Sequence, residues 1–155
     1  MSDTYTIHIP GTLSEHKLTI MGQLPGLNEY TEANRRHAQK GARMKRECQD
    51  LVTWHIMSQL RAPRGRVRFA GPVFLLFTFY EKDRRRDHDN VSSFARKVIQ
   101  DALVEAGTLV GDGWKGVAGY MDRFEVDAKR QRIVVEFIEQ EAAPCKERQS
   151  KKSKK

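Results

Sequence analysis

Residues 72–80 read Pro-Val-Phe-Leu-Leu-Phe-Thr-Phe-Tyr, and residues 81–90 read Glu-Lys-Asp-Arg-Arg-Arg-Asp-His-Asp-Asn. The first stretch is a largely apolar run of nine residues. It is too short to cross a membrane as a helix, which needs about twenty apolar residues, so it predicts a buried strand. Eight of the ten residues that follow are charged and cannot continue a buried element. The strand is expected to end at this change in composition.

A helix is predicted directly after the charged stretch, over about residues 90–107. Asp89 or Asn90 is suited to cap its start, and Gly107 is suited to close its end. The apolar face of this helix consists of Val91, Phe94, Ala95, Val98, Ala102, Leu103 and Ala106. The sequence Gly-Asp-Gly at 111–113 then predicts a sharp turn.

Further strands and one long helix are predicted on either side of this unit. Four more segments have the pattern of strands, at residues 5–9, 18–20, 117–126 and 131–138. The first two are expected to form two short strands or one hairpin. Residues 31–60 contain no proline and predict a long helix, despite Gly41. Its apolar stripe, which belongs to either the core or an interface, is made of Leu51, Trp54, His55 and Met57 or Ser58.

These elements together predict an α+β fold, a single domain in which a mixed β-sheet is packed by helices. Residues 1–16 are expected to form an N-terminal extension or strand, and residues 17–139 the folded domain. Residues 140–155 are expected to form a basic, disordered tail. With 155 residues the chain is long enough to bury a core without disulfides.

The net charge of the chain points to a polyanionic partner. Twenty-eight Lys and Arg residues against 20 Asp and Glu residues give a net charge of +8, which is typical of proteins that bind nucleic acid or membrane surfaces. Residues 145–155 contribute +5 of this charge, so the remainder of the chain is close to balanced.

The cellular compartment is suggested by the cysteines and the N-terminus. Cys48 and Cys145 are far apart in the sequence and favour neither a disulfide framework nor a zinc site. The first residues have no signal-peptide pattern, so we expect a cytoplasmic protein without a membrane partner.

Three aspartates fall where the predicted elements end. Asp87 and Asp89 are two residues apart, and in an extended segment their side chains would point the same way. The helix that follows returns the chain toward the sheet and is expected to present Asp112 near this pair. Carboxylate oxygens are the ligands that Mg²⁺ prefers, so a metal site is predicted. The alternative is that the pair belongs to a solvated loop and supplies only a helix cap.

The spacing of these residues resembles the RusA family of Holliday junction resolvases, which are small endodeoxyribonucleases of phages, prophages and bacteria. The resemblance covers about residues 17–139. The motifs that carry it are residues 85–90, Lys97, residues 101–103, 106–107 and 112–115, and Leu27-Asn28-Glu29-Tyr30 with Ala33 and Arg35. It implies a RusA-like fold and metal-dependent hydrolysis of phosphodiesters in recombination and repair, with Mg²⁺ or Mn²⁺ as cofactor. It also implies four-way junctions as substrate, and a homodimer.

The family pattern also implies roles for single residues. Asp87, Asp89 and Asp112 match its metal ligands, and Lys97 matches its functional lysine, with Arg96 as the competing assignment. Asn90 and Asp101 are expected to support the site, although Asp101 also suits an ordinary helix surface. The best-known member has two aspartates at the turn where this chain has Gly111 and Asp112, so the site is expected to rely on Asp112 alone.

Two basic runs near the proposed site are expected to contact DNA phosphates, because each neutralised phosphate releases counterions. Their residues are Arg35, Arg36, Lys40, Arg43, Lys45, Arg46, Arg84, Arg85 and Arg86. A solvated helix face is the alternative for the first six. His88 is interpreted as a spacer between the ligands. Trp114 is expected to pack beside the turn, and stacking on a base is the alternative. The rival functions are a DNA-binding protein of the same fold without catalysis, and a basic adaptor that acts through its tail.

Overall fold

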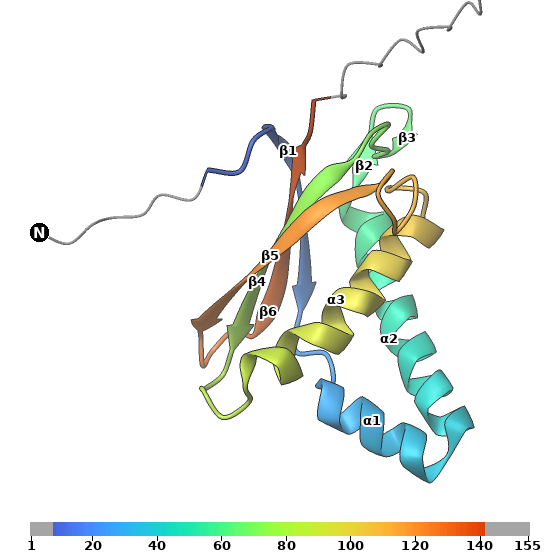
Figure 1. Ribbon diagram of the computed structural model, residues 1–155, viewed down its shortest axis with the longest axis vertical. Helices are drawn as coiled ribbons and strands as arrows, with labels where there is room; N and C mark the ends of the chain where they lie inside the picture. Colours follow the sequence, from blue (N-terminus) through green and yellow to red (C-terminus); the bar gives the residue numbers. More distant parts are fainter. Residues whose placement is uncertain (1–7, 142–155) are drawn as a thin grey trace, which may run out of the picture.

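The run at 72–80 forms strand β4 (Val73–Glu81), which ends at the charged stretch as predicted. Phe77 and Phe79 on this strand are almost completely buried, because the helices cover the face of the sheet to which they point. The computed structural model describes residues 8–141, and in these residues β4 is an inner strand of a four-stranded sheet (Figure 1).

The sheet is mixed and has the strand order β1-β6-β4-β5. Strand β5 runs parallel to β4, whereas β6 runs antiparallel to both β4 and β1. The other three strands of this sheet are β1 (Thr12–Met21), β5 (Val117–Val126) and β6 (Arg132–Glu139). The three helices of the described residues lie on one side of the sheet (Figure 1). The predicted α+β fold with a mixed sheet packed by helices is therefore confirmed.

Helix α3 (His88–Glu105) connects the parallel strands β4 and β5. The helix predicted at 90–107 is confirmed, and Gly107 follows its end with a φ of 79°, a value that favours glycine. Parallel strands end at the same edge of a sheet, so the ends of β4 and β5 and the start of α3 meet there. This edge is where open sheets with parallel strands commonly bind ligands.

The long helix predicted at 31–60 is wrong in one respect, because two helices occupy this region. Helices α1 (Leu27–Arg36) and α2 (Ala38–Gln59) are separated by His37, whose backbone is extended at φ −153° and ψ 126°. Gly41 permits the close approach of the two helices, since a Cβ atom there would lie 1.8 Å from the Asn34 Oδ1 atom. At and directly beside His37 the sequence contains no proline or glycine that would predict this break.

From residue 8 onward, the N-terminal region contains one strand, which covers the second of the two strands expected; the first, at residues 5–9, lies largely outside the described residues. Strand β1 begins at Thr12, within the predicted extension at 1–16, and pairs with β6 up to Met21. The expectations for residues 1–7 and for most of the tail, residues 142–155, lie outside the described residues. Two-residue strands β2 (Arg61–Ala62) and β3 (Gly65–Arg66) form a short hairpin after α2.

The apolar stripe predicted on α2 belongs to the core only at His55, and its alternative place, at an interface, stays a prediction. Leu51 is 44% exposed and Trp54 is 66% exposed, and of the predicted stripe only His55 is buried. The buried face instead consists of Gly41, Cys48, Val52, His55 and Ile56.

Within residues 8–141, no helix combines the length and the apolar character that crossing a membrane requires.

Candidate active site

The start of α3 is set by Asp87, which precedes the helix with an extended backbone. Its Oδ1 atom accepts a hydrogen bond from the Asn90 amide at 2.8 Å, which satisfies one of the amides that a helix start leaves unpaired. The expectation that Asp89 or Asn90 caps the helix is therefore wrong. The Oδ2 atom of Asp87 takes no part in this cap.

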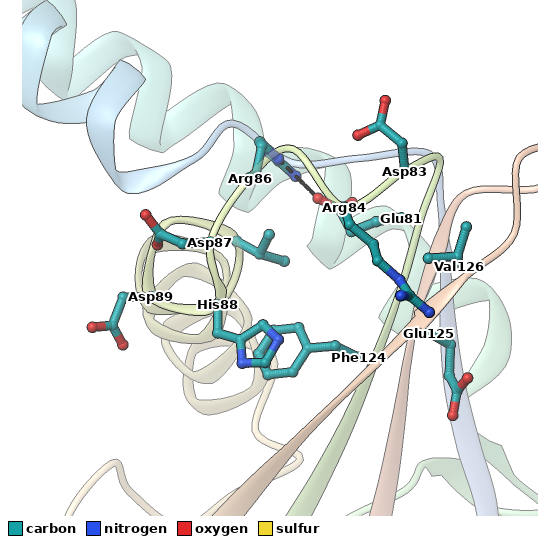
Figure 2. A pocket seen from close by; sticks show the side chains of 11 residues that line it. Glu81, Asp83, Arg84, Arg86, Asp87, His88, Asp89, Phe124, Glu125 and Val126 are labelled. Atoms are coloured by element: carbon teal, nitrogen blue, oxygen red, sulfur yellow. Dashed lines mark hydrogen bonds and ion pairs between the residues drawn. The ribbon is translucent and has the colours of Figure 1, made fainter.

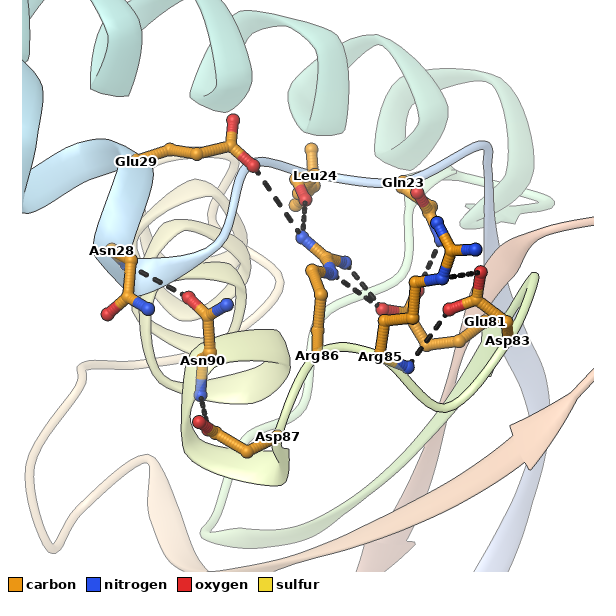
Figure 3. Close-up of polar contacts among 10 residues, drawn as sticks. All are labelled: Gln23, Leu24, Asn28, Glu29, Glu81, Asp83, Arg85, Arg86, Asp87 and Asn90. Carbon is orange, nitrogen blue, oxygen red and sulfur yellow. Dashed lines mark hydrogen bonds and ion pairs between the residues drawn. The ribbon is translucent and has the colours of Figure 1, made fainter.

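Asn90 connects two helix starts (Figure 3). Its Oδ1 atom accepts a hydrogen bond from the Asn28 amide at 2.9 Å, in the first turn of α1. Gly26 precedes α1 and has no side chain to cap it, and a Cβ atom there would lie 2.4 Å from the Asn90 Oδ1 atom. Asn90 thus caps α1 from α3, so residues 27–30 and 85–90, which carry the family resemblance, meet in space.

Asp89 lies in the first turn of α3 and is exposed. The sequence predicts an extended backbone from Asp87 to Asp89. Only Asp87 is extended, because the helix begins at His88. Both aspartates nevertheless line one pocket, and Figure 2 shows their carboxylates directed away from the rings of His88 and Phe124. No hydrogen bond or ion pair within residues 8–141 uses the Asp89 carboxylate, so both of its oxygens are available to a ligand.

His88 points to the other side of the helix start from these carboxylates. Its ring stacks on Phe124 of β5, with centroids 3.8 Å apart and planes 2° apart. This arrangement agrees with its interpretation as a spacer between the two aspartates.

The pocket lined by Asp87 and Asp89 has a volume of about 600 Å³ and lies at the edge where β4 and β5 end (Figure 2). Its lining residues are Glu81, Asp83, Arg84, Arg86, Asp87, His88, Asp89, Val91, Phe124, Glu125 and Val126. Five of these are acidic and two are arginines, so with neutral histidine the lining carries a net charge of −3. A protein with a net charge of +8 therefore has a negatively charged pocket at this edge.

Arg86 is held inside the protein and supports the loop before α3 (Figure 3). Its guanidinium contacts the Glu81 Oε1 atom at 2.6 Å and donates a hydrogen bond to the Leu24 carbonyl at 3.2 Å. Gln23 donates to the second Glu81 oxygen at 2.7 Å. Sequence reasoning missed the role of Glu81, although an acidic residue at the end of an apolar strand is a signal for a buried ion pair. Arg86, predicted to bind DNA, is already occupied by this network.

The neighbouring arginines are more accessible. Arg84 is exposed at the pocket, and the Arg85 side chain is 87% exposed, with its Nε atom 3.6 Å from an Asp83 oxygen. Of the three arginines predicted to contact DNA here, Arg84 and Arg85 are placed where a phosphate can reach them.

A second group of charged residues surrounds Lys97, farther along α3. The Lys97 Nζ atom lies 3.0 Å from Asp101 and 3.8 Å from Asp112, and the Lys45 Nζ atom of α2 lies 3.1 Å from Asp101. The hydrogen bond to Asp101 is the main cause that raises the pKa of Lys97 above its usual value. Lys97 therefore stays positively charged at neutral pH.

Asp101 does more than occupy a helix surface, because it pairs with lysines from two helices. Burial is the largest single influence on the pKa of Asp101 and raises it, but hydrogen bonds and charges from Lys97 and Lys45 together outweigh burial. The pKa of Asp101 consequently lies below its usual value. This ion pair explains why Lys45, predicted to bind DNA, is only partly exposed.

Arg96, the competing assignment for Lys97, has a different environment. Its guanidinium pairs with Asp122 of β5 and lies over the Tyr120 ring, 4.1 Å from the centroid. The side chains of Arg96 and Asp122 are 17% and 16% exposed. Of the two cations, Lys97 is thus the one that faces Asp112.

The three predicted metal ligands do not form one cluster. Within residues 8–141, no group of three or more His, Cys, Asp or Glu side chains is arranged to hold a metal ion. Asp112 contacts Lys97, which is eight residues after Asp89, a separation of about 12 Å along a helix. Asp87 and Asp89 alone still suit Mg²⁺, which commonly binds one or two carboxylates and keeps several water molecules. The assignment of Asp112 as a ligand stays a prediction.

The basic run on α1 and α2 lies largely on the surface. Its exposed members are Arg35, Arg36, Lys40, Arg43 and Arg46. Arg36 forms an i, i+4 pair with Glu32 at 3.0 Å, which is a weak contact on an exposed helix. These side chains are accessible to a phosphate backbone.

Trp114 does not pack beside the turn, so that expectation is wrong. It follows the Gly-Asp-Gly turn at 111–113 and is 98% exposed.

No protein-family model matches the chain, and no curated protein matches it. The residues at 81–115 are therefore interpreted below from their positions and chemistry, together with the family resemblance of their spacing.

Proposed function

We propose that this protein is a Mg²⁺-dependent endodeoxyribonuclease that cuts four-way junctions or other branched DNA. The observation that carries this proposal is the acidic pocket at the start of α3, where Asp87 and Asp89 keep free carboxylate oxygens. Outside this pocket the protein carries a net positive charge, as a DNA-binding surface requires.

The negative charge of the pocket favours the binding of a cation, which must precede the binding of a DNA phosphate there. A lining with a net charge of −3 repels a phosphate, and a divalent cation held by Asp87 and Asp89 would reverse this effect. Mg²⁺, or Mn²⁺ in its place, would neutralise charge on the phosphodiester and activate a water molecule for attack. The Asp87 Oδ2 atom and the two Asp89 oxygens are the ligands that the fold leaves available.

Lys97 is proposed to stabilise negative charge on the reacting phosphate. Because it lies eight residues after Asp89, about 12 Å along α3, this role requires its long side chain to extend toward the start of the helix. Its raised pKa makes it a fixed cation at neutral pH rather than a general base. Asp101 holds this ammonium group at 3.0 Å and is thus a positioning residue. Asp112 contacts the same group, and its further role as a metal ligand is part of the proposal.

Exposed basic residues on α1 and α2, together with Arg84 and Arg85, are proposed to bind phosphates along the DNA arms. A four-way junction contains two equivalent strands to cut, so a homodimer with two-fold symmetry would place one site at each. We place this activity in the cytoplasm, in the recombination and repair of bacterial or phage DNA.

The test compares a synthetic four-way junction with a duplex of matched sequence, in Mg²⁺ and in EDTA. Paired nicks near the branch point, seen only with Mg²⁺ and only in the junction, are the expected result. Asp89→Asn should abolish them, whereas Asp50→Asn, a matched change at an exposed position of α2, should not. Cleavage that survives in EDTA, or in Asp89→Asn, would show that the metal assignment is wrong.

A DNA-binding protein of this fold without catalysis is the second candidate. It is favoured by the distance of Asp112 from the Asp87 and Asp89 pair, which leaves two carboxylates together rather than three. Tight binding of the junction without cleavage in either metal would select this function.

A further inference from the structure

Trp114 presents an almost fully exposed indole ring between β5 and the end of α3. At 98% exposure it contacts little of the protein and contributes little to the core. An exposed tryptophan on a flexible loop need not have a function. The rigidity of the loop that carries Trp114 therefore indicates whether its exposure is a fixed feature of the fold.

The loop that carries Trp114 is anchored at both ends. Leu109 is 2% exposed, and its amide donates to the Leu103 carbonyl at 3.2 Å. At the other end, the Gly116 carbonyl accepts a hydrogen bond from the Val73 amide at 3.0 Å, which ties the loop to β4.

Between these anchors the chain makes a closed turn. The amides of Gly116 and Val117 both donate to the Gly113 carbonyl at 3.0 Å. A Cβ atom at Gly116 would lie 1.9 Å from the Gly111 carbonyl oxygen, so a residue with a side chain would have to open the turn. Trp114 is therefore held outward by a fixed turn.

One exposed positive charge lies directly beside this ring in the sequence. Lys115 is exposed, and Asp112, two residues before Trp114, contacts Lys97, whose side chain is 56% exposed. Lys97 is eight residues after Asp89 on α3, which is about 12 Å along the helix, or roughly three to four base steps of one DNA strand. Trp114 is thus placed a few nucleotides away from the pocket of Asp87 and Asp89.

We propose that Trp114 stacks on a DNA base that has left the duplex stack, at a branch point or in a single strand. This inference rests on the proposed function for its partner and adds the residue that would recognise unstacked bases. An exposed aromatic ring stacks on any base whose π-face is free, whereas the bases of an intact duplex already stack on each other. Trp114 would consequently favour branched over duplex DNA.

The fluorescence of Trp114 can be observed alone, because the chain contains only one other tryptophan, Trp54. The Trp54→Phe variant is titrated in EDTA with a four-way junction, a single strand and a duplex, and binding is followed separately by the anisotropy of labelled DNA. We expect strong quenching of the emission by the junction and the single strand, and little by the duplex. Unchanged emission at saturated junction binding would overturn the proposal.

Affinity provides the second measurement. Trp114→Ala should weaken junction binding about tenfold, which is the usual effect of losing one stacked base, and leave duplex binding nearly unchanged. Trp114→Phe should retain most of the affinity. The control is Leu13→Ala, which removes an exposed apolar side chain of β1 and should not alter binding. An equal loss for junction and duplex would overturn the stacking role.

Three further outcomes show whether this inference, the proposed function or both are overturned. Quenching and selective loss of affinity without cleavage would support stacking while overturning the nuclease. No anisotropy change with any DNA would overturn both. Emission that ignores the junction but shifts to the blue with vesicles of phosphatidylglycerol and phosphatidylcholine would overturn stacking and assign Trp114 to a membrane surface.

Discussion

The start of α3 and the region around Lys97 both contain carboxylates, but the two regions use them differently. Asp89 has no ion-pair partner within residues 8–141, whereas Asp101 pairs with Lys45 at 3.1 Å and with Lys97 at 3.0 Å. The charges around Lys97 are thus neutralised by the fold itself. Within residues 8–141 the Asp89 carboxylate has no such partner, and this difference distinguishes a candidate cation site from a region whose charges are already paired.

The largest effect is expected when a carboxylate at the start of α3 is removed. Asp89→Asn should lower the rate of junction cleavage in Mg²⁺ by roughly a thousandfold, because a metal contributes several kcal/mol of charge stabilisation. The free energy of unfolding should stay within about 0.5 kcal/mol, since Asp89 makes no contact that the fold needs. A large loss of stability would contradict this description of Asp89.

The next effect concerns the cation that faces Asp112. Lys97→Met should lower the cleavage rate about a hundredfold, which is typical for the loss of one group that stabilises transition-state charge. Junction affinity in EDTA should change less than about threefold, because one exposed phosphate contact contributes little. Lys97→Arg should recover part of the rate. Lys17→Met, a change at an exposed position of β1, which lies at the opposite edge of the sheet from β5, serves as control.

A smaller effect, on stability, distinguishes Arg96 from Lys97. Arg96→Met leaves the Asp122 carboxylate partly buried without its partner, so the free energy of unfolding should fall by about 2 kcal/mol. Urea unfolding measures this change, and the double variant with Asp122→Asn should recover part of it. If Arg96→Met instead lowers cleavage and leaves stability intact, the assignment of the two cations must be exchanged.

The smallest effect depends on pH. The pKa of Asp101 is lowered in the folded protein, so its contribution to stability is present above the unfolded pKa of about 4 and is lost as the pH falls through the folded value. Asp101→Asn should reduce the free energy of unfolding by about 0.5–1 kcal/mol at pH 7 and have almost no effect at about pH 2. A difference that persists at low pH would show that packing, rather than charge, stabilises this position.

The sheet and α3 were predictable because their signals are local. The run at 72–80 and the apolar face of α3 each combine a composition with a period, and both elements occur where expected. The break at His37 has no local signal, since it arises where α1 and α2 pack against each other around Gly41. Leu51 and Trp54 share a helical spacing with His55 but lie outside the core, and only the packing of α2 decides which of these side chains is buried.

The candidate site was predictable in its residues but less so in its geometry. Asp87, Asp89 and Asn90 can all cap a helix, and only tertiary contacts select Asp87 for α3 and Asn90 for α1. The contact of Asp112 with Lys97 depends on how the loop after α3 folds back, which no periodicity records. The same holds for Trp114, whose exposure follows from the closed turn at Gly116.

The double use of the segment at 87–90 has an evolutionary consequence. Asp87 and Asn90 each cap the start of a helix. A descendant without the proposed nuclease chemistry would therefore still be selected to retain them. Asp89 holds nothing in place and would be the first of the three to drift. If the proposed nuclease activity is correct, homologues in which Asp89 alone is replaced should fold and bind DNA without cutting it.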